Sequence, residues 1–200
     1  MKIRLAFLVL LLVILSLVSG SCRGKPDGDD EVAVLETNYG KIVIEFLPKA
    51  APKHVANFKE LARDGFYDGT RFHRIVMDKN RRVAIQGGDP NTINGAPSTW
   101  GLGQRGQKMV PAEFSKLKHE RGIVSAARRP DDPNSATSQF FIFVGSQPTF
   151  DGQYSIFGRV IDGMNVVDSI ALAPVNQKSE MPADPVVINR VYIAKRDEVK

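Results

Sequence analysis

The sequence predicts a mainly β protein, in which eight short antiparallel strands close into a β-barrel capped by two α-helices. Short apolar stretches alternate with turn residues, and no strand–helix–strand repeat is visible. The chain contains 17 glycines and 12 prolines, more than a helix bundle would accommodate. Its 200 residues, 42% of them hydrophobic, suffice for one domain with its own core. Charged residues make up 24%, which excludes a wholly disordered or coiled-coil chain.

The predicted elements follow one another from residue 32. Residues 32–36 and 42–46 are short, mostly apolar stretches on either side of a turn at 37–40, which is typical of a β-hairpin. Pro52 can open a helix, whose apolar residues recur at helical spacing until Gly65 ends it. Further strands are predicted over 71–76, 83–86, 122–127, 139–144, 155–160 and 186–194, and a second helix over 164–170. Residues 90–111 are predicted to form a loop long enough to carry function.

The N-terminus has the order of a secretory signal peptide over residues 1–21. A short basic stretch precedes an apolar run over 5–18, interrupted only by Ser16, and small residues follow it. This run is shorter than the ~20 residues that a membrane-spanning helix needs. An uncleaved membrane anchor is the alternative interpretation.

Cys22 is the only cysteine, so no intramolecular disulfide can form and the fold depends on packing alone. Its place after the apolar run and the small residues resembles a bacterial lipoprotein signal, in which this cysteine carries the lipid. Residues 22–31 would then be the lipid-anchor cysteine and a flexible polar tether. Ser19 stands where such signals usually carry an aliphatic residue, which leaves ordinary cleavage near Gly20 or Ser21 open. We expect an extracytoplasmic, membrane-anchored lipoprotein of the periplasm or cell envelope, or a soluble periplasmic or secreted protein with ordinary cleavage.

Four longer motifs lie in the remainder of the chain. They are FYDGTRFHRI at 66–75, QGGD at 86–89, SATSQFFI at 135–142 and FDGQYSIFGRV at 150–160. In order and near-family spacing they resemble the cyclophilins, peptidyl-prolyl cis-trans isomerases built on an eight-stranded β-barrel with two helices. The resemblance covers about residues 32–194, and we expect a cyclophilin-like isomerase domain over 32–196.

The reaction that this resemblance implies is rotation about an X–Pro imide bond. Partial double-bond character makes the uncatalysed rotation take tens to hundreds of seconds. No bond is broken, so no metal and no organic cofactor is expected. The resemblance makes Arg74 the catalytic arginine, whose permanently charged, forked guanidinium can donate towards the proline nitrogen. It makes Gln86 the site glutamine, which would position Arg74 and contact the peptide backbone.

The resemblance also implies a substrate-binding surface around the proline ring. Its predicted residues are Phe141 as the floor, Phe150 on the wall, Val83 and Ala84 where the family has a Phe-Met pair, Ala127 and Arg128 for main-chain contacts, and Tyr154 where many members have histidine. About four extra residues separate Arg74 from Gln86, and a bulge is expected over 77–82. Thr149 stands where members that bind cyclosporin carry tryptophan, so weak inhibition by cyclosporin is expected.

A second function class remains open beside the enzyme. Val83 and Ala84 remove apolar area from the pocket, which would weaken substrate binding. The alternative is therefore a chaperone or scaffold module that holds proline-containing segments with little turnover. A lipocalin-like ligand barrel is a third reading, which the motifs disfavour.

The expected partners follow from the same observations. The formal charge of +5 is spread over the chain without a basic block, so no nucleic-acid partner is expected. His54, His73 and His119 do not have the spacing of a metal ligand set, and structural roles are expected for them. We expect a monomer that binds proline-containing polypeptides, and a membrane contact through the lipid anchor alone.

Overall fold

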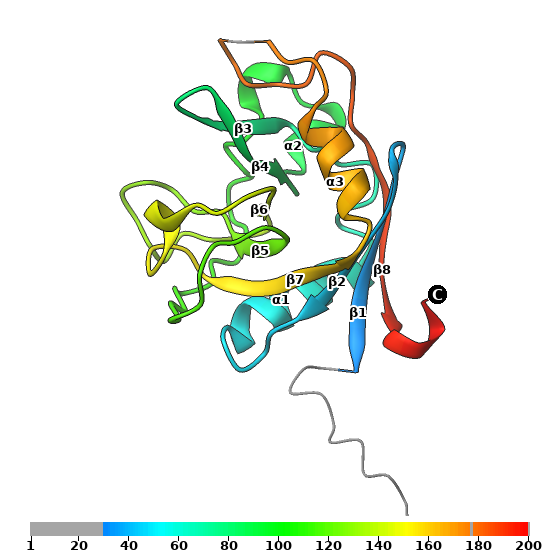
Figure 1. Ribbon diagram of the computed structural model, residues 1–200, viewed down its shortest axis with the longest axis vertical. Helices are drawn as coiled ribbons and strands as arrows, with labels where there is room; N and C mark the ends of the chain where they lie inside the picture. The colour runs from blue at the N-terminus through cyan, green and yellow to red at the C-terminus, as the bar shows by residue number, and fades with distance from the viewer. Residues whose placement is uncertain (1–29, 177, 200) are drawn as a thin grey trace, which may run out of the picture.

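Eight strands form one curled antiparallel sheet in the computed structural model, which describes residues 30–176 and 178–199 (Figure 1). The order across the sheet is β3-β4-β6-β5-β7-β2-β1-β8. The strands are β1 (Glu31–Thr37), β2 (Gly40–Phe46), β3 (Arg74–Asp78), β4 (Arg81–Gly87), β5 (Ile123–Ala126), β6 (Phe140–Phe143), β7 (Ile156–Asp162) and β8 (Ile188–Lys195). The described helices are α1 (Pro52–Arg63), α2 (Asn91–Asn94) and α3 (Met164–Ala171), with 3-10 turns η1 (Pro97–Thr99), η2 (Pro148–Phe150) and η3 (Arg196–Glu198).

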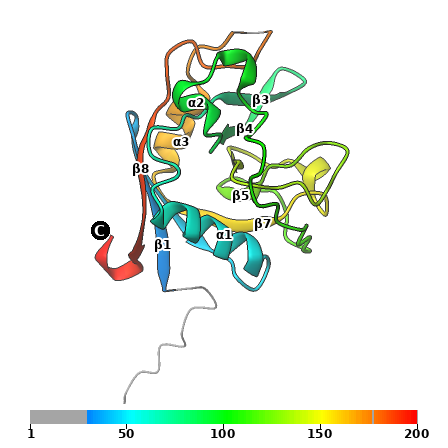
Figure 2. The same ribbon diagram turned by 180° about the vertical axis from the view of Figure 1, so that it is seen from behind.

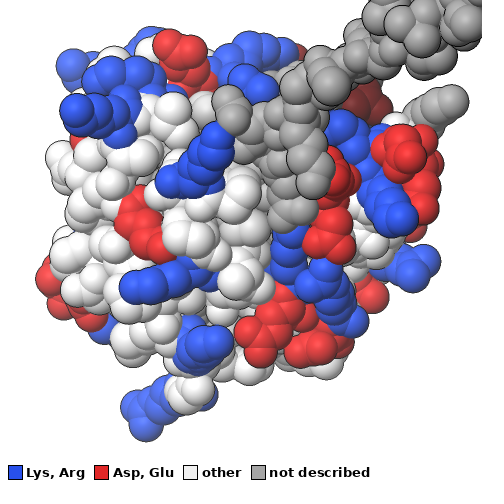
Figure 3. All heavy atoms as spheres, turned by 90° about the horizontal axis from the view of Figure 1, so that it is seen from below, with Lys and Arg blue, Asp and Glu red and all other residues white. Residues whose placement is uncertain are grey.

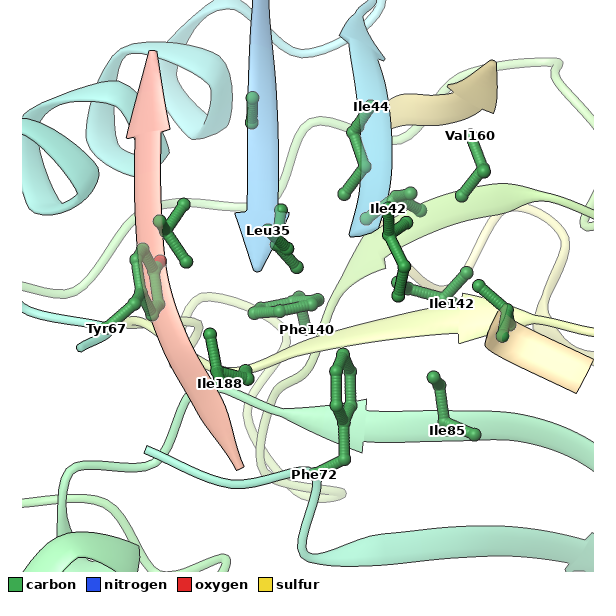
Figure 4. Close-up of a cluster of buried hydrophobic side chains, with 14 of the residues drawn as sticks. Leu35, Ile42, Ile44, Tyr67, Phe72, Ile85, Phe140, Ile142, Val160 and Ile188 are labelled. Atoms are coloured by element: carbon green, nitrogen blue, oxygen red, sulfur yellow. The ribbon is translucent and has the colours of Figure 1, made fainter. Parts of the chain in front are cut away.

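The hydrophobic core lies on the concave side of the sheet. Successive side chains of a strand point to opposite faces, so every second residue reaches the interior. Ile75, Ile85 and Ile142 stand opposite one another on β3, β4 and β6, and all three are fully buried. Figure 4 shows Ile85 and Ile142 converging with Leu35 and Phe140 on this common interior. The mainly β class predicted from alternation is thereby confirmed.

Two of the helices complete the core. Helix α1 begins at Pro52, whose fixed φ suits the first helical turn, and it buries Val55, Phe58 and Ala62 at helical spacing. It packs against β7 and β8, whereas α3 packs against β2 and β4 (Figures 1 and 2). These are the two helices that the sequence predicts.

The predicted closure of the barrel is wrong. The edge strands β3 and β8 share no ladder, and the chain segments before them meet only in an isolated bridge between Arg71 and Val187 and its neighbouring main-chain bonds. The segment between α3 and β8 contains Pro174, Pro182 and Pro185. Because proline has no N–H to donate, this segment cannot pair along β3 as a strand would. The sheet is therefore an open, curled half-barrel.

A third helix was also not predicted. Helix α2 and turn η1 lie within the segment expected to be a plain loop. Asp89 is fully buried, and its carboxylate accepts hydrogen bonds from the backbone N–H groups of Asn91 (2.9 Å), Gly101 (2.5 Å) and Gly103 (3.3 Å). Asp89 directly follows Gly88 in the motif QGGD. Gly88 has φ +85, and a Cβ at this position would lie 2.6 Å from Ser138 O, so only glycine fits here. The long loop is thus organised around one carboxylate.

The extra residues between Arg74 and Gln86 lengthen the β3–β4 hairpin. Lys79 and Asn80 form its two-residue turn with φ of +46 and +64, as the right-handed twist of a hairpin favours. A register shift follows Val76, so the bulge expected near this position is present in the ladder.

The surface mixes both signs of charge on the face that Figure 3 shows, where blue and red side chains lie among uncharged ones. Within residues 30–176 and 178–199, no helix has the length and apolar character needed to cross a membrane. The predicted signal peptide (1–21), Cys22 and the tether up to residue 29 lie outside the described residues.

Candidate active site

Three predicted site residues form one row across three neighbouring strands. Arg74 on β3 stands opposite Gln86 on β4, and Gln86 stands opposite Phe141 on β6. Directly opposed residues of an antiparallel pair point to the same face of the sheet. Since the adjacent residues Ile75 and Ile85 fill the core, this row lies on the outer, convex face. Sheet register therefore brings together side chains that are far apart in sequence.

An apolar cluster adjoins the row on the same face. Its buried members are Val76, Val83, Ala84, Ala127, Phe141 and Phe143, and Ile123, Phe150 and Tyr154 pack against it. Phe150 and Tyr154 stack with ring centroids 4.6 Å apart, and Phe141 meets both edge-on at 5.9 and 5.8 Å. We call Phe141, Phe150 and Tyr154 the aromatic platform. It offers apolar surface of the kind that a proline ring needs.

Val83 and Ala84, which are predicted for the pocket, lie beneath the aromatic platform. Ala84 is fully buried and Val83 nearly so, so they shape the layer beneath the aromatic platform rather than its exposed surface. Phe141 itself is only 6% exposed. Small side chains therefore line the place where a pocket was expected, and the role of Val83 and Ala84 in substrate binding stays a prediction.

Arg74 is held by an acidic residue that sequence reasoning did not single out. Its Nε donates to Glu180 Oε2 at 2.6 Å. The backbone N–H of Met77 donates to the other carboxylate oxygen at 3.2 Å, and the N–H of Ile75 donates to the main-chain oxygen of Glu180 at 2.8 Å. The Arg74 side chain remains 45% exposed, so its guanidinium is fixed at one corner and accessible from solvent.

Gln86 is buried and connected to a neighbour on the opposite side from Arg74. Its Nε2 donates to Gln139 Oε1 at 2.9 Å, and Gln139 Nε2 donates to Gly101 O at 3.0 Å. Gln86 Oε1 is buried and accepts no hydrogen bond from the described residues. A buried acceptor without a partner costs about 1–3 kcal/mol, so a donor from a bound peptide would be favoured here. Gln86 was expected to position Arg74, but the side chain that contacts Arg74 is Glu180.

Ala127 and Arg128 border the platform. The N–H of Ala127 donates to Gln139 O at 2.9 Å, so it is already occupied within the fold. The Arg128 guanidinium lies 4.6 Å from the ring centroid of Tyr154, and its Nε donates to Gln153 O at 3.1 Å. The side chain of Arg128 thus braces Tyr154, and the main-chain contacts expected at these two positions stay a prediction.

A buried histidine supports the platform from behind. The ring of His119 lies 4.9 Å from Phe143 and 5.9 Å from Phe150, and its Nδ1 is 3.0 Å from Asp151 Oδ1. Burial lowers the pKa of His119 below its ordinary value, against the opposing effect of Asp151. A neutral ring at neutral pH therefore packs against Phe150 and fixes its orientation.

A separate hollow of about 480 Å³ does not coincide with this row. It is lined by residues that include Arg71, Phe72, Trp100 and Met181. The chain's only tryptophan therefore lies at this hollow, whereas Thr149 is exposed in η2 beside Phe150.

Sequence reasoning missed two residues of the site, Gln139 and Glu180, and only Gln139 lies in one of the motifs. Gln139 stands inside the motif SATSQFFI, so its place beside Phe141 could have suggested a role. Glu180 stands in a segment without helix or strand, and no local pattern relates it to Arg74.

Comparisons with known proteins agree with the fold. The family model "Cyclophilin type peptidyl-prolyl cis-trans isomerase/CLD" matches residues 32–193. "Peptidyl-prolyl cis-trans isomerase-like 3" of Gallus gallus is 40% identical over 162 residues, which cover 80% of this chain and 93% of that protein. "Peptidyl-prolyl cis-trans isomerase-like 1" of Mus musculus is 37% identical over 164 residues, covering 79% and 89%.

Solved structures show the same fold. The crystal structure of a Cryptosporidium parvum cyclophilin-type isomerase, determined in the presence of the dipeptide Ala-Pro, aligns with a TM-score of 0.71 and 32% identity, covering 82% of this chain and 99% of that one. A cyclophilin from Hirschia baltica aligns with a TM-score of 0.66 over 88% of this chain and 76% of its own, and its 23% identity supports the fold alone. The chain therefore belongs to the cyclophilin-type peptidyl-prolyl cis-trans isomerases.

Proposed function

We propose that this isomerase acts on proline-containing segments of extracytoplasmic proteins, with Arg74 as its catalytic residue. The observation that carries the catalytic part is the cross-strand row of Arg74, Gln86 and Phe141. It sets a permanent cation, a buried free acceptor and an apolar ring beside one another on one accessible face. A rotation that breaks no bond needs these three features and no nucleophile.

The chemistry follows from what each group can do to a bound X–Pro segment. The proline ring rests on the aromatic platform, and Gln86 Oε1 accepts a backbone N–H of the peptide. The terminal nitrogens of Arg74 donate towards the imide nitrogen, whose lone pair becomes available only as the bond twists out of plane. This hydrogen bond is therefore stronger in the twisted state than in either planar one, which is the condition for lowering the barrier.

An isomerisation assay distinguishes the enzyme from the binding module. Purified protein is mixed with a peptide that contains Ala-Pro-Phe, and the cis-to-trans rate is followed by a protease that cleaves only the trans form. We expect a rate that rises linearly with protein concentration. Binding of the peptide without any increase in this rate would favour the module and contradict the proposal.

The proposed location rests on residues 1–31. The signal-like order and Cys22 support export followed by lipid attachment at that cysteine. One acyl chain binds membranes only marginally, so attachment of more than one chain is the physically sufficient form. The polar tether would separate the domain from the membrane surface.

Cell fractionation tests the location. The change Cys22→Ser should move the protein from the membrane to the soluble extracytoplasmic fraction with its isomerase activity unchanged, whereas the control Ser16→Ala should stay at the membrane. Wild-type protein that is already soluble, with an unmodified Cys22 by mass spectrometry, would contradict lipid anchoring.

A further inference from the structure

We infer that Glu180 is a positioning residue for catalysis, which orients the Arg74 guanidinium from a segment outside the sheet. This inference rests on the proposed catalytic role of Arg74. It concerns a residue that lies neither in the cross-strand row nor in the aromatic platform.

Glu180 binds β3 through all three of its oxygens. Its Oε2 accepts from Arg74 Nε at 2.6 Å, and its Oε1 accepts from the Met77 N–H at 3.2 Å. Its main-chain oxygen accepts from the Ile75 N–H at 2.8 Å. The carboxylate is thus fixed to the backbone of the strand that carries Arg74, and the guanidinium is oriented relative to that backbone rather than by a mobile partner.

The backbone conformation of Glu180 also supports a positioning role. Its φ of +56 lies in the left-handed region, which a non-glycine residue adopts only when its surroundings favour it. The Glu180 N–H donates to Asn176 O at 2.8 Å, and the Asn176 N–H donates to Met181 O at 2.9 Å. These bonds form a tight turn that presents the Glu180 side chain, 22% exposed, to Arg74.

The choice of Nε has a consequence for catalysis. A guanidinium carries five N–H donors in one plane, and the bond at Nε leaves those of the two terminal nitrogens for a substrate while it fixes the plane. An arginine as exposed as Arg74 would otherwise sample several rotamers, and ordering it in the transition state would slow the reaction. The effect should therefore fall on kcat, because Glu180 does not belong to the apolar surface that would bind the proline ring.

The change Glu180→Gln tests this role with little change of shape. We expect kcat for an Ala-Pro peptide to fall about three- to tenfold with KM unchanged. Glu180→Asp, which keeps the charge on a shorter side chain, should restore part of the loss. The matched control is Asp168→Asn, which removes the carboxylate from the ion pair with Arg121, also at 2.6 Å and also partly exposed. It should leave kcat at the wild-type value.

A double-variant comparison separates positioning from a structural role. In the Arg74→Ala background, Glu180→Gln should cause no further loss of kcat, because its effect acts through Arg74. The inference is overturned if Glu180→Gln alone has wild-type kcat, or if it lowers kcat by the same factor in both backgrounds. Full turnover by Arg74→Ala would instead refute the catalytic assignment of Arg74 itself, and the two failures are therefore distinguishable.

Discussion

Replacing Arg74 by alanine should remove most of the catalytic activity but change the stability of the fold only slightly. The residue touches the fold mainly through its ion pair with Glu180, in which the two side chains are 45% and 22% exposed. Exposed pairs of this kind contribute about 0–1 kcal/mol to the free energy of unfolding. The other two bonds of Glu180 to β3 do not involve the Arg74 side chain, so the strand keeps its support.

The expected loss of rate is larger than the loss of stability. A hydrogen bond from a charged donor is worth about 1.5–3 kcal/mol where its partner is otherwise unpaired. If the whole bond forms only in the twisted state, kcat/KM should fall by roughly 10- to 150-fold. Arg74→Lys should recover little of this loss, because an ammonium lacks the planar fork and the Nε–H that Glu180 holds.

The measurement combines protease-coupled isomerisation with thermal unfolding. Arg121→Ala is the matched control, because Arg121 is 48% exposed and pairs with Asp168 on the surface. Both variants should melt within a few degrees of the wild type, and only Arg74→Ala should lose activity. Retained turnover in Arg74→Ala, or an equal loss in Arg121→Ala, would refute the argument from the cross-strand row.

Three further outcomes are expected. Phe141→Leu should raise KM for proline peptides about three- to tenfold through lost apolar contact, with a smaller change in kcat, as steady-state kinetics would show; an unchanged KM would remove Phe141 from the binding surface. Burial lowers the pKa of His73 from 6.5 to about 4, so the fold keeps its ring neutral. The contribution of His73 to the free energy of unfolding is complete above pH 6.5 and falls by about 3 kcal/mol as the pH drops to 4, because over this range the proton binds to the unfolded chain in preference to the folded one. The free energy of unfolding, measured by urea at several pH values, should fall more steeply between pH 6.5 and 4 for the wild type than for His73→Phe. An equal pH dependence of the two proteins would contradict the assignment. Cyclosporin should inhibit turnover weakly, and Thr149→Trp should strengthen inhibition; tight inhibition of the wild type would show that the missing indole matters little.

Local patterns were sufficient for most of the secondary structure. The hairpin over 32–46, the helix that begins at Pro52 and the helix over 164–170 were predicted close to their observed bounds, because period-two alternation, helical spacing and turn residues act over a few positions. The strand predicted from 71 begins only at Arg74. The residues before it are held by the segment that leads into β8, and such a distant partner leaves no local signal.

The candidate site also contains residues that the sequence could identify and one that it could not. Arg74, Gln86 and Phe141 could be named from motifs, and the sheet register places them in one row. The partner of Arg74 could not be named, because Glu180 reaches β3 from an irregular segment more than a hundred residues later.

The sequence by itself determined the mainly β class and the approximate positions of most strands along the chain, since these depend on short-range patterns. Its contiguous motifs named Arg74, Gln86 and Phe141 as candidate site residues. Only the tertiary structure decided that the sheet stays open and that Glu180, rather than Gln86, holds Arg74. Both outcomes depend on how a proline-containing segment crosses the edge of the sheet. Its course is set by hydrogen bonds between distant parts of the chain, which no local pattern specifies.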